Sequence, residues 1–233
     1  MGETNSWKER EVFLSFFFLE VIMEEYSEEW LKAFDGTIKP DKIDMCNLTN
    51  SIEKFVSQFE YDYKTDLKDY DKITIKVLNT NIPHLMGISR NHHVGLPTTQ
   101  GEVIFEGLKK DWTLKKLMDG DKRWFAANKE KLIGCIFLYQ MLNIIECSVY
   151  TTINSGKHKR LERDNIYFII FKYPGSNSYS IELTPENNSD GKVYTPRSLK
   201  INDEIERYCK KIDLKLVDKR RIKINKKRIY KKW

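Results

Sequence analysis

The chain has 233 residues, 40% of them hydrophobic and 12% aromatic, which is enough for an ordinary buried core. The longest apolar run, residues 12–23, is interrupted by Ser15 and Glu20 and is too short to span a bilayer. It also lacks a small-residue cleavage site. These features exclude a membrane protein, disfavour a secreted one and predict a cytoplasmic protein.

The positive charge lies at the end of the chain. Of 40 basic residues, nine fall within 219–233, where no acidic residue occurs; the remainder has 31 basic against 34 acidic residues, a net charge of −3. Such a local field favours a nucleic-acid partner. The expected phosphate contacts are Arg220, Arg221, Lys223, Lys226, Lys227 and Arg228, with a second basic patch at Lys157, Lys159 and Arg160.

The four cysteines, Cys46, Cys135, Cys147 and Cys209, are far apart and form no C-x-x-C pair. This spacing argues against a zinc site or a redox dithiol and is typical of free thiols in a reducing compartment. We expect neither a metal nor a cofactor.

The first part of the chain reads as mainly helical. Apolar and aromatic residues recur at helical spacing over 7–34, and this wide face goes either to the core or to a partner protein. A second helix is predicted over 47–59 and a connector over 60–71. Alternating residues over 72–77 then predict a strand, followed by a turn at 79–83.

Helices and then strands follow. A short helix is expected over 112–118 and a long central helix over 121–145. The later predicted elements are strands over 148–153, 165–172 and 178–183, a last helix over 202–211 and a strand-like stretch at 214–217. The fold class is therefore α+β: a helical N-terminal part (1–70), then a mainly antiparallel sheet packed on a long central helix (71–218). Residues 219–233 form a basic tail or an edge strand.

His84 is the first candidate for chemistry. It directly follows the predicted strand, Pro83 fixes the turn before it and Gly87 permits a tight backbone after it. A histidine held at the end of a strand can transfer protons near neutral pH; the alternative is a structural histidine. His92 and His93 are expected to be mobile loop residues rather than metal ligands.

Arg197 and Ser198 lie just before the predicted last helix, where free backbone N–H groups, a guanidinium and a hydroxyl together suit a phosphate. The alternative is a proline turn with a solvated arginine. A metal-dependent nuclease arrangement is a weaker pattern. It takes either Glu102 and Glu106 with Lys109 or Lys110, or Glu182 near Lys192, and neither set follows a proline-aspartate step.

The order of these features resembles a known family. A strand entering Asn81-Ile82-Pro83-His84-Leu85-Met86-Gly87, a helix with Lys131-Leu132, a three-strand meander and Pro196-Arg197-Ser198-Leu199 are similar to phage-associated nuclease domains of the barnase, EndoU, colicin and RelE-like superfamily. The likeness is to the fourth phage group and covers about residues 70–205. Met86 stands where the family more often has threonine.

The resemblance implies an α+β ribonuclease that works without a metal, through attack of the ribose 2′-hydroxyl on the adjacent phosphate. His84 would then be the base or acid, Arg197 and Ser198 would hold the phosphate, and Lys131 would add charge. Such a protein would act as a toxin or phage-defence effector, with an inhibitor protein or a second copy bound through the N-terminal helix. The alternatives are a non-catalytic nucleic-acid-binding protein and a metal-dependent DNA endonuclease.

Overall fold

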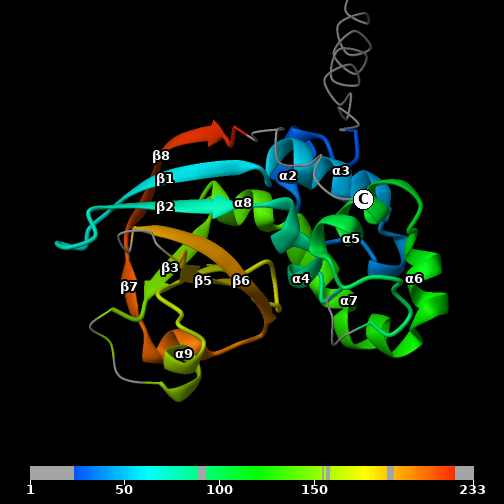
Figure 1. Ribbon diagram of the computed structural model, residues 1–233. Helices are drawn as coiled ribbons and strands as arrows, with labels where there is room; N and C mark the ends of the chain where they lie inside the picture. The colour runs from blue at the N-terminus through cyan, green and yellow to red at the C-terminus, as the bar shows by residue number, and fades with distance from the viewer. Residues whose placement is uncertain (1–23, 89–92, 154, 156–157, 188–191, 224–233) are drawn as a thin grey trace, which may run out of the picture.

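The structure is a computed structural model that describes residues 24–88, 93–153, 155, 158–187 and 192–223. It confirms the α+β class (Figure 1). The helices are α2 (Glu28–Ala33), α3 (Met45–Phe55), α4 (Ile82–Leu85), α5 (Gly101–Lys110), α6 (Leu114–Gly120), α7 (Lys122–Ile136), α8 (Leu138–Leu142) and α9 (Lys159–Arg163), with 3-10 turns η1 (Pro40–Lys42), η2 (Asn79–Asn81) and η3 (Ile205–Tyr208).

The strands are β1 (Phe59–Thr65), β2 (Lys72–Val77), β3 (Cys147–Thr151), β4 (Phe168–Lys172), β5 (Tyr179–Pro185), β6 (Val193–Ile201), β7 (Lys210–Ile212) and β8 (Leu214–Arg221). Among the described residues, no helix has both the length and the apolar character needed to cross a membrane.

All eight strands form one sheet, in the order β7-β3-β4-β5-β6-β2-β1-β8. Its two outermost strands are consecutive in the chain and are separated only by Asp213, so the sheet has to curl until its two edges approach. Neighbouring strands are antiparallel except β2 and β6, which pair in parallel only where Thr74 meets Val193 and Ile75 meets Tyr194. Beyond that point β6 has no strand on this side and packs against helices.

The curled sheet surrounds α8. Every residue of this short helix is buried, and Figure 1 shows it lying between β1 and β2 on one side and β3 to β6 on the other. Its single strongly polar side chain, Gln140, donates hydrogen bonds to the carbonyls of Leu31 and Phe34 at 3.0 and 2.7 Å. The buried amide is thereby satisfied, and it ties α2 to the core.

A smaller apolar cluster lies on the outer face of the sheet, where α9 and η3 cover β4. All five residues of β4 are therefore buried, as expected for a strand covered on both faces. The members of this cluster are Leu161, Ile166, Ile169, Phe171 and Ile205.

Both long predicted helices require correction. Residues 7–23 lie outside the described part of the chain; after them comes a turn in which Tyr26 has a φ of +64°, and α2 begins only at Glu28 with Ser27 as its cap. The central helix is divided at Phe137 into α7 and α8. Since every residue of α8 is buried, hydrophobic periodicity could not reveal this division.

The C-terminal prediction also fails in part. The expected helix over 202–211 is the 3-10 turn η3 followed by β7, because Asn202 adopts a φ of +51° and its side-chain oxygen accepts a hydrogen bond from Ser178 N. The supposed connector over 60–71 contains most of β1, and residue 70 falls in the loop of the β1–β2 hairpin. Strand β2 lies as predicted, and β3 to β5 lie within two or three residues of their predicted bounds.

The side chain of Lys219 on β8 is held by contacts within the protein. Its ammonium donates a 2.8 Å hydrogen bond to the carbonyl of Phe55, and it lies over the rings of Phe59, Tyr61 and Tyr139 at 4.6, 5.4 and 5.4 Å. Burial lowers the pKa of this lysine. Lys219, the first cation of the basic tail, is therefore engaged in contacts within the protein.

We predict that Lys219→Ala lowers the free energy of unfolding by about 2 kcal/mol, since it removes a desolvated cation–π contact and a charged hydrogen bond. Lys215→Ala, on the exposed side of the same strand, is the control and should change stability by less than about 0.5 kcal/mol. Urea unfolding followed by tryptophan fluorescence measures both; equal effects would contradict the contact's role.

Candidate functional site

Three elements that are distant in sequence, α4, α7 and β6, pack against one another at the middle of the molecule (Figure 1). They carry three of the residues singled out from the sequence, namely His84, Lys131 and Arg197. The contact arises because β2 ends at Val77 while β6 continues, so the chain after β2 folds into η2 and α4 beside the unpaired side of β6.

His84 lies in α4, a single helical turn, rather than in an extended turn after the strand. Pro83 stands near the start of this helix, where its missing N–H costs nothing. Its neighbours Ile82, Pro83 and Leu85 are buried, whereas His84 is exposed. The helix is therefore anchored by apolar side chains and presents the imidazole at the surface.

Gly87 sets the position of α4 against α7. It has a φ of +72°, and its carbonyl accepts a 2.8 Å hydrogen bond from Trp124 Nε1. A Cβ atom at this position would overlap with the side-chain amide of Asn128. Only glycine combines this backbone conformation with so close an approach, so the tight backbone expected from the sequence serves packing between the two helices.

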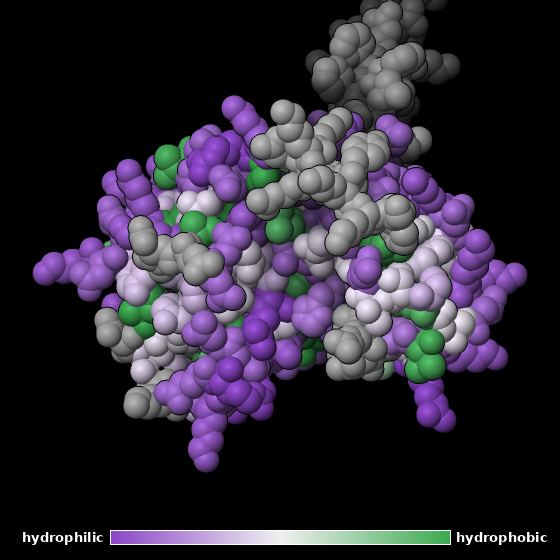
Figure 2. All heavy atoms as spheres, viewed as in Figure 1, coloured by the Kyte–Doolittle hydropathy of each residue, from purple (hydrophilic) through white to green (hydrophobic). Residues whose placement is uncertain are grey.

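Arg197 is the extra residue of a β-bulge. Opposite it on β5, Glu182 pairs with Ser198 and Leu183 pairs with Pro196, which leaves Arg197 without a partner in the register. Bulges re-aim a side chain and are frequent beside functional sites. The guanidinium is about half exposed. Figure 2 shows hydrophilic side chains gathered over β6 and α9.

The sequence context expected for Arg197 is wrong. No helix follows it, since residues 194–199 lie inside β6, so helix N–H groups cannot contribute to a phosphate site there. Its charged neighbour is Asp164, 3.7 Å away. The hydrogen bond from Arg163, together with the charges of Arg197 and Lys200, lowers the pKa of Asp164.

Ser198 is directed away from Arg197. Its hydroxyl donates to the buried carboxylate of Glu182, which Arg160 also binds, at 2.5 Å; the same guanidinium reaches Asp203 at 2.6 Å. Two carboxylates thus neutralise Arg160, which was expected to contact nucleic acid. Glu182 belongs to this network, which argues against its predicted pairing with Lys192.

Lys131 is half-buried on α7, and burial together with the nearby charge of Lys200 lowers its pKa. Lys200 on β6 is thus electrostatically coupled both to Lys131 and to Asp164. Lys200 could not be singled out from local sequence patterns, because only the fold brings β6 beside α7. Lys131, Lys200, Asp164 and Arg197 form one connected group of charges.

The predicted basic surface is smaller than the sequence suggests. Arg220 pairs with Glu60 at 2.9 Å and with Asp62, and Arg221 packs over Phe59 at 5.1 Å. Lys159 and Lys223 are exposed. Four of the other predicted contacts lie outside the described residues: Lys157, Lys226, Lys227 and Arg228.

His93 and the pair formed by Glu106 and Lys109 have structural contacts. His93, expected to be mobile, is buried; its Nε2 is 2.9 Å from the carbonyl of Leu117, and its Nδ1 accepts from Gly95 N. Glu106 and Glu53 are both held by Lys109, at 3.3 and 2.6 Å.

The described ranges also show the state of the cysteines and whether side chains gather to hold a metal ion. All four cysteines are free; Cys135 is buried and burial raises the pKa of its thiol. No group of three or more His, Cys, Asp or Glu side chains is arranged there to hold a metal ion.

We predict that Gly87→Ala destabilises the protein by about 3 kcal/mol, through an unfavourable left-handed backbone and the overlap with Asn128. Gly175→Ala is the matched control, because Gly175 has a φ of +62° but open space around it; it should cost about 1 kcal/mol. Denaturant unfolding of the two variants measures the difference, and equal losses would show that the α4–α7 contact is not tight.

No protein-family model, curated protein or solved structure matches this chain. The function of this site therefore has to be inferred from the chemistry of its own residues.

Proposed function

We propose that the protein is a metal-independent endoribonuclease, with the site where α4, α7 and β6 meet as its active centre. The observation that carries this proposal is the mutual packing of the elements bearing His84, Lys131 and Arg197, which are the imidazole, ammonium and guanidinium that such a reaction needs. The resemblance seen in the sequence points to the same chemistry and the same histidine.

The proposed reaction is transesterification followed by departure of the 5′ product. The ribose 2′-oxygen forms a bond to the adjacent phosphorus while its proton passes to a base; the bond from phosphorus to the 5′-oxygen breaks, and that oxygen receives a proton from an acid. The products are a 2′,3′-cyclic phosphate and a free 5′-hydroxyl. His84, exposed on a rigidly anchored turn, fits the role of base.

Arg197 and Lys131 fit the other two roles. An exposed guanidinium on a bulge can form two hydrogen bonds to the phosphoryl oxygens, where negative charge develops. A lysine whose pKa is lowered by burial and by Lys200 gives up its proton more readily than an ordinary lysine, which suits the acid for the 5′-oxygen. Ser198, turned toward Glu182, is left out of this mechanism.

The second candidate function is nucleic-acid binding without catalysis. It is favoured by one observation: Ser198, the expected hydrogen-bond donor to the phosphate, is engaged by Glu182. Such a protein would grip phosphates through Arg197 and the tail, and would recruit a partner protein. A metal-dependent DNA endonuclease stands third, because Glu106 is already held by Lys109.

We predict cleavage of labelled single-stranded RNA in the presence of EDTA. His84→Ala should reduce the rate at least 100-fold, the scale of a lost general base, and Arg197→Ala should reduce it about 100-fold, as loss of a charge-stabilising donor does. Arg207→Ala, an exposed arginine on η3 that pairs with Glu204, is the control and should leave the rate unchanged.

The same assay separates the three functions. RNA binding without cleavage by the wild-type protein supports the non-catalytic alternative. Cleavage that appears only with Mg²⁺, or that is unaffected by His84→Ala, contradicts the proposed mechanism. The melting temperature of each variant shows whether a loss of rate reflects a loss of folding.

We further predict that removal of residues 224–233 weakens RNA binding more than it alters the cleavage pattern, since phosphate contacts carry no sequence information. The cut is placed after Lys223 so that β8, which extends to Arg221, and the hydrogen bond of Lys219 are both retained. Filter binding at several salt concentrations measures the effect. Truncation should also lower the salt dependence; unchanged affinity and salt dependence would show that the tail is not part of the binding surface.

A further inference from the structure

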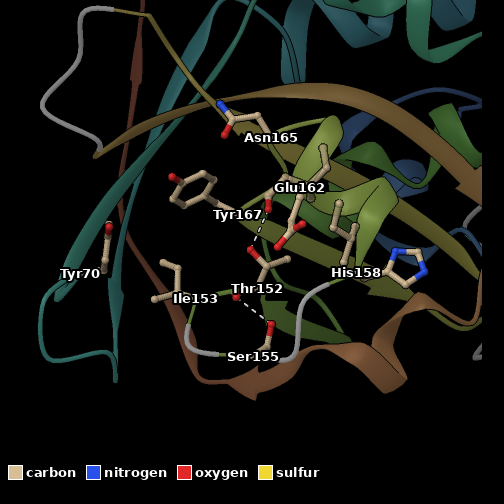
Figure 3. A pocket seen from close by; sticks show the side chains of 10 residues that line it. Tyr70, Thr152, Ile153, Ser155, His158, Glu162, Asn165 and Tyr167 are labelled. Atoms are coloured by element: carbon tan, nitrogen blue, oxygen red, sulfur yellow. Dashed lines mark hydrogen bonds between the residues drawn. The ribbon is translucent and has the colours of Figure 1, made fainter.

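A hollow of about 480 Å³ opens beside α9, in the size range of pockets for small ligands. Its walls come from three separate parts of the chain: the β1–β2 loop, the segment after β3, and α9 with the residues leading into β4. The residues used below are Tyr70, Thr152, Ile153, Glu162, Asn165 and Tyr167 (Figure 3).

Several polar side chains of this hollow have no hydrogen-bond or ion-pair partner among the described residues. Within the described part of the chain, the side chains of Tyr70, Glu162, Asn165 and Tyr167 make no hydrogen bond or ion pair. The hydroxyl of Thr152, in contrast, donates to the carbonyl of Ile166 at 2.7 Å and fixes the wall. Figure 3 shows the Glu162 carboxylate pointing toward Thr152. With respect to the described residues, the hollow therefore offers unused donors and acceptors on a fixed frame.

The composition of the walls suits a flat, aromatic ligand. Tyr70, Ile153 and Tyr167 supply two rings and an apolar side chain against which a planar ring can stack. Glu162 and Asn165 supply hydrogen-bond acceptors and a donor for groups in the plane of that ring. A nucleobase has this combination of a π face and a polar edge, and proteins bind unpaired bases through such contacts.

The hollow adjoins the proposed active centre. Asn165 follows Asp164, which lies 3.7 Å from the guanidinium of Arg197. The ring of Tyr167 contacts that of Tyr194 on β6, with centroids 6.0 Å apart. Tyr194 precedes Arg197 by three residues, about 10 Å along a strand. A single RNA strand can therefore place one base in the hollow and a neighbouring phosphate on Arg197.

We propose that this hollow binds one unpaired nucleobase, that of the RNA strand whose phosphate contacts Arg197. The inference rests on the proposed function in taking RNA as the ligand, but it does not require cleavage. It assigns base recognition to Tyr167, Glu162 and Asn165, and leaves phosphate contact to Arg197.

The test is a nuclear magnetic resonance titration of the full chain with the four nucleoside 3′-monophosphates, with ribose 5-phosphate and inorganic phosphate as probes that lack a base. We expect at least one nucleotide to bind at least tenfold more tightly than ribose 5-phosphate. Tyr167→Leu should weaken that binding about tenfold, as loss of a stacking partner does, and Glu162→Gln or Asn165→Ala should change which nucleotide binds best. Tyr173→Leu, an exposed tyrosine at the opposite end of β4, is the control.

Equal binding of ribose 5-phosphate and every nucleotide overturns the inference, as does unchanged binding by all three variants. Since Glu162 and Asn165 are exposed, their variants remain informative if Tyr167→Leu fails to fold. The result is independent of catalysis: nucleotide binding that needs Tyr167 in a protein that cannot cleave RNA supports the hollow and refutes the nuclease. Cleavage that needs His84, with nucleotide binding insensitive to the three variants, supports the nuclease and refutes the hollow as a base site.

Discussion

The structure depends on the short connection that joins the two edge strands of one sheet. Strands β7 and β8 occupy opposite edges of the eight-stranded sheet although only Asp213 separates them. The sheet must therefore curl, and the curl creates the space that α8 fills. Lys219 stabilises this closure at the β8 edge by placing its cation between an acceptor carbonyl and three aromatic rings. Edge strands are otherwise prone to pair with other chains.

The same closure determines where chemistry can occur. Because β2 and β6 pair over only two residues, the remainder of β6 is open to α4 and α7. The bulge at Arg197 lies within this open half and turns a guanidinium outward. Gly87 lets α4 approach α7 closely enough for Trp124 to reach its carbonyl. The proposed active centre is thus a consequence of an incomplete strand pairing, and the adjoining hollow lies where the loops at one end of the sheet meet.

Parts of this arrangement could be predicted from the sequence. The alternation in β2 and the β-rich composition after Cys147 located β2 to β5, and the position of His84 just after a strand indicated a candidate site. The alternation of Phe59, Tyr61 and Tyr63 with charged residues was equally informative but was obscured by the acidic composition, which Arg220 balances from the neighbouring strand. The bulge at Arg197, the pairing of Ser198 with Glu182 and the role of Lys200 depend on partners distant in sequence. Local patterns carry no information about such pairings.

Fewer of the tail cations are candidates for phosphate contact than the composition suggested. Three of the nine tail cations, Lys219, Arg220 and Arg221, make contacts within the protein, so six remain as candidates for phosphate contact. The central claim, attack by a ribose 2′-hydroxyl without a metal, is tested most directly by an RNA oligonucleotide containing one 2′-deoxy residue at a normally cleaved position, incubated in EDTA. The account predicts that cleavage is lost at that position and retained elsewhere. Cleavage at the 2′-deoxy position would contradict it.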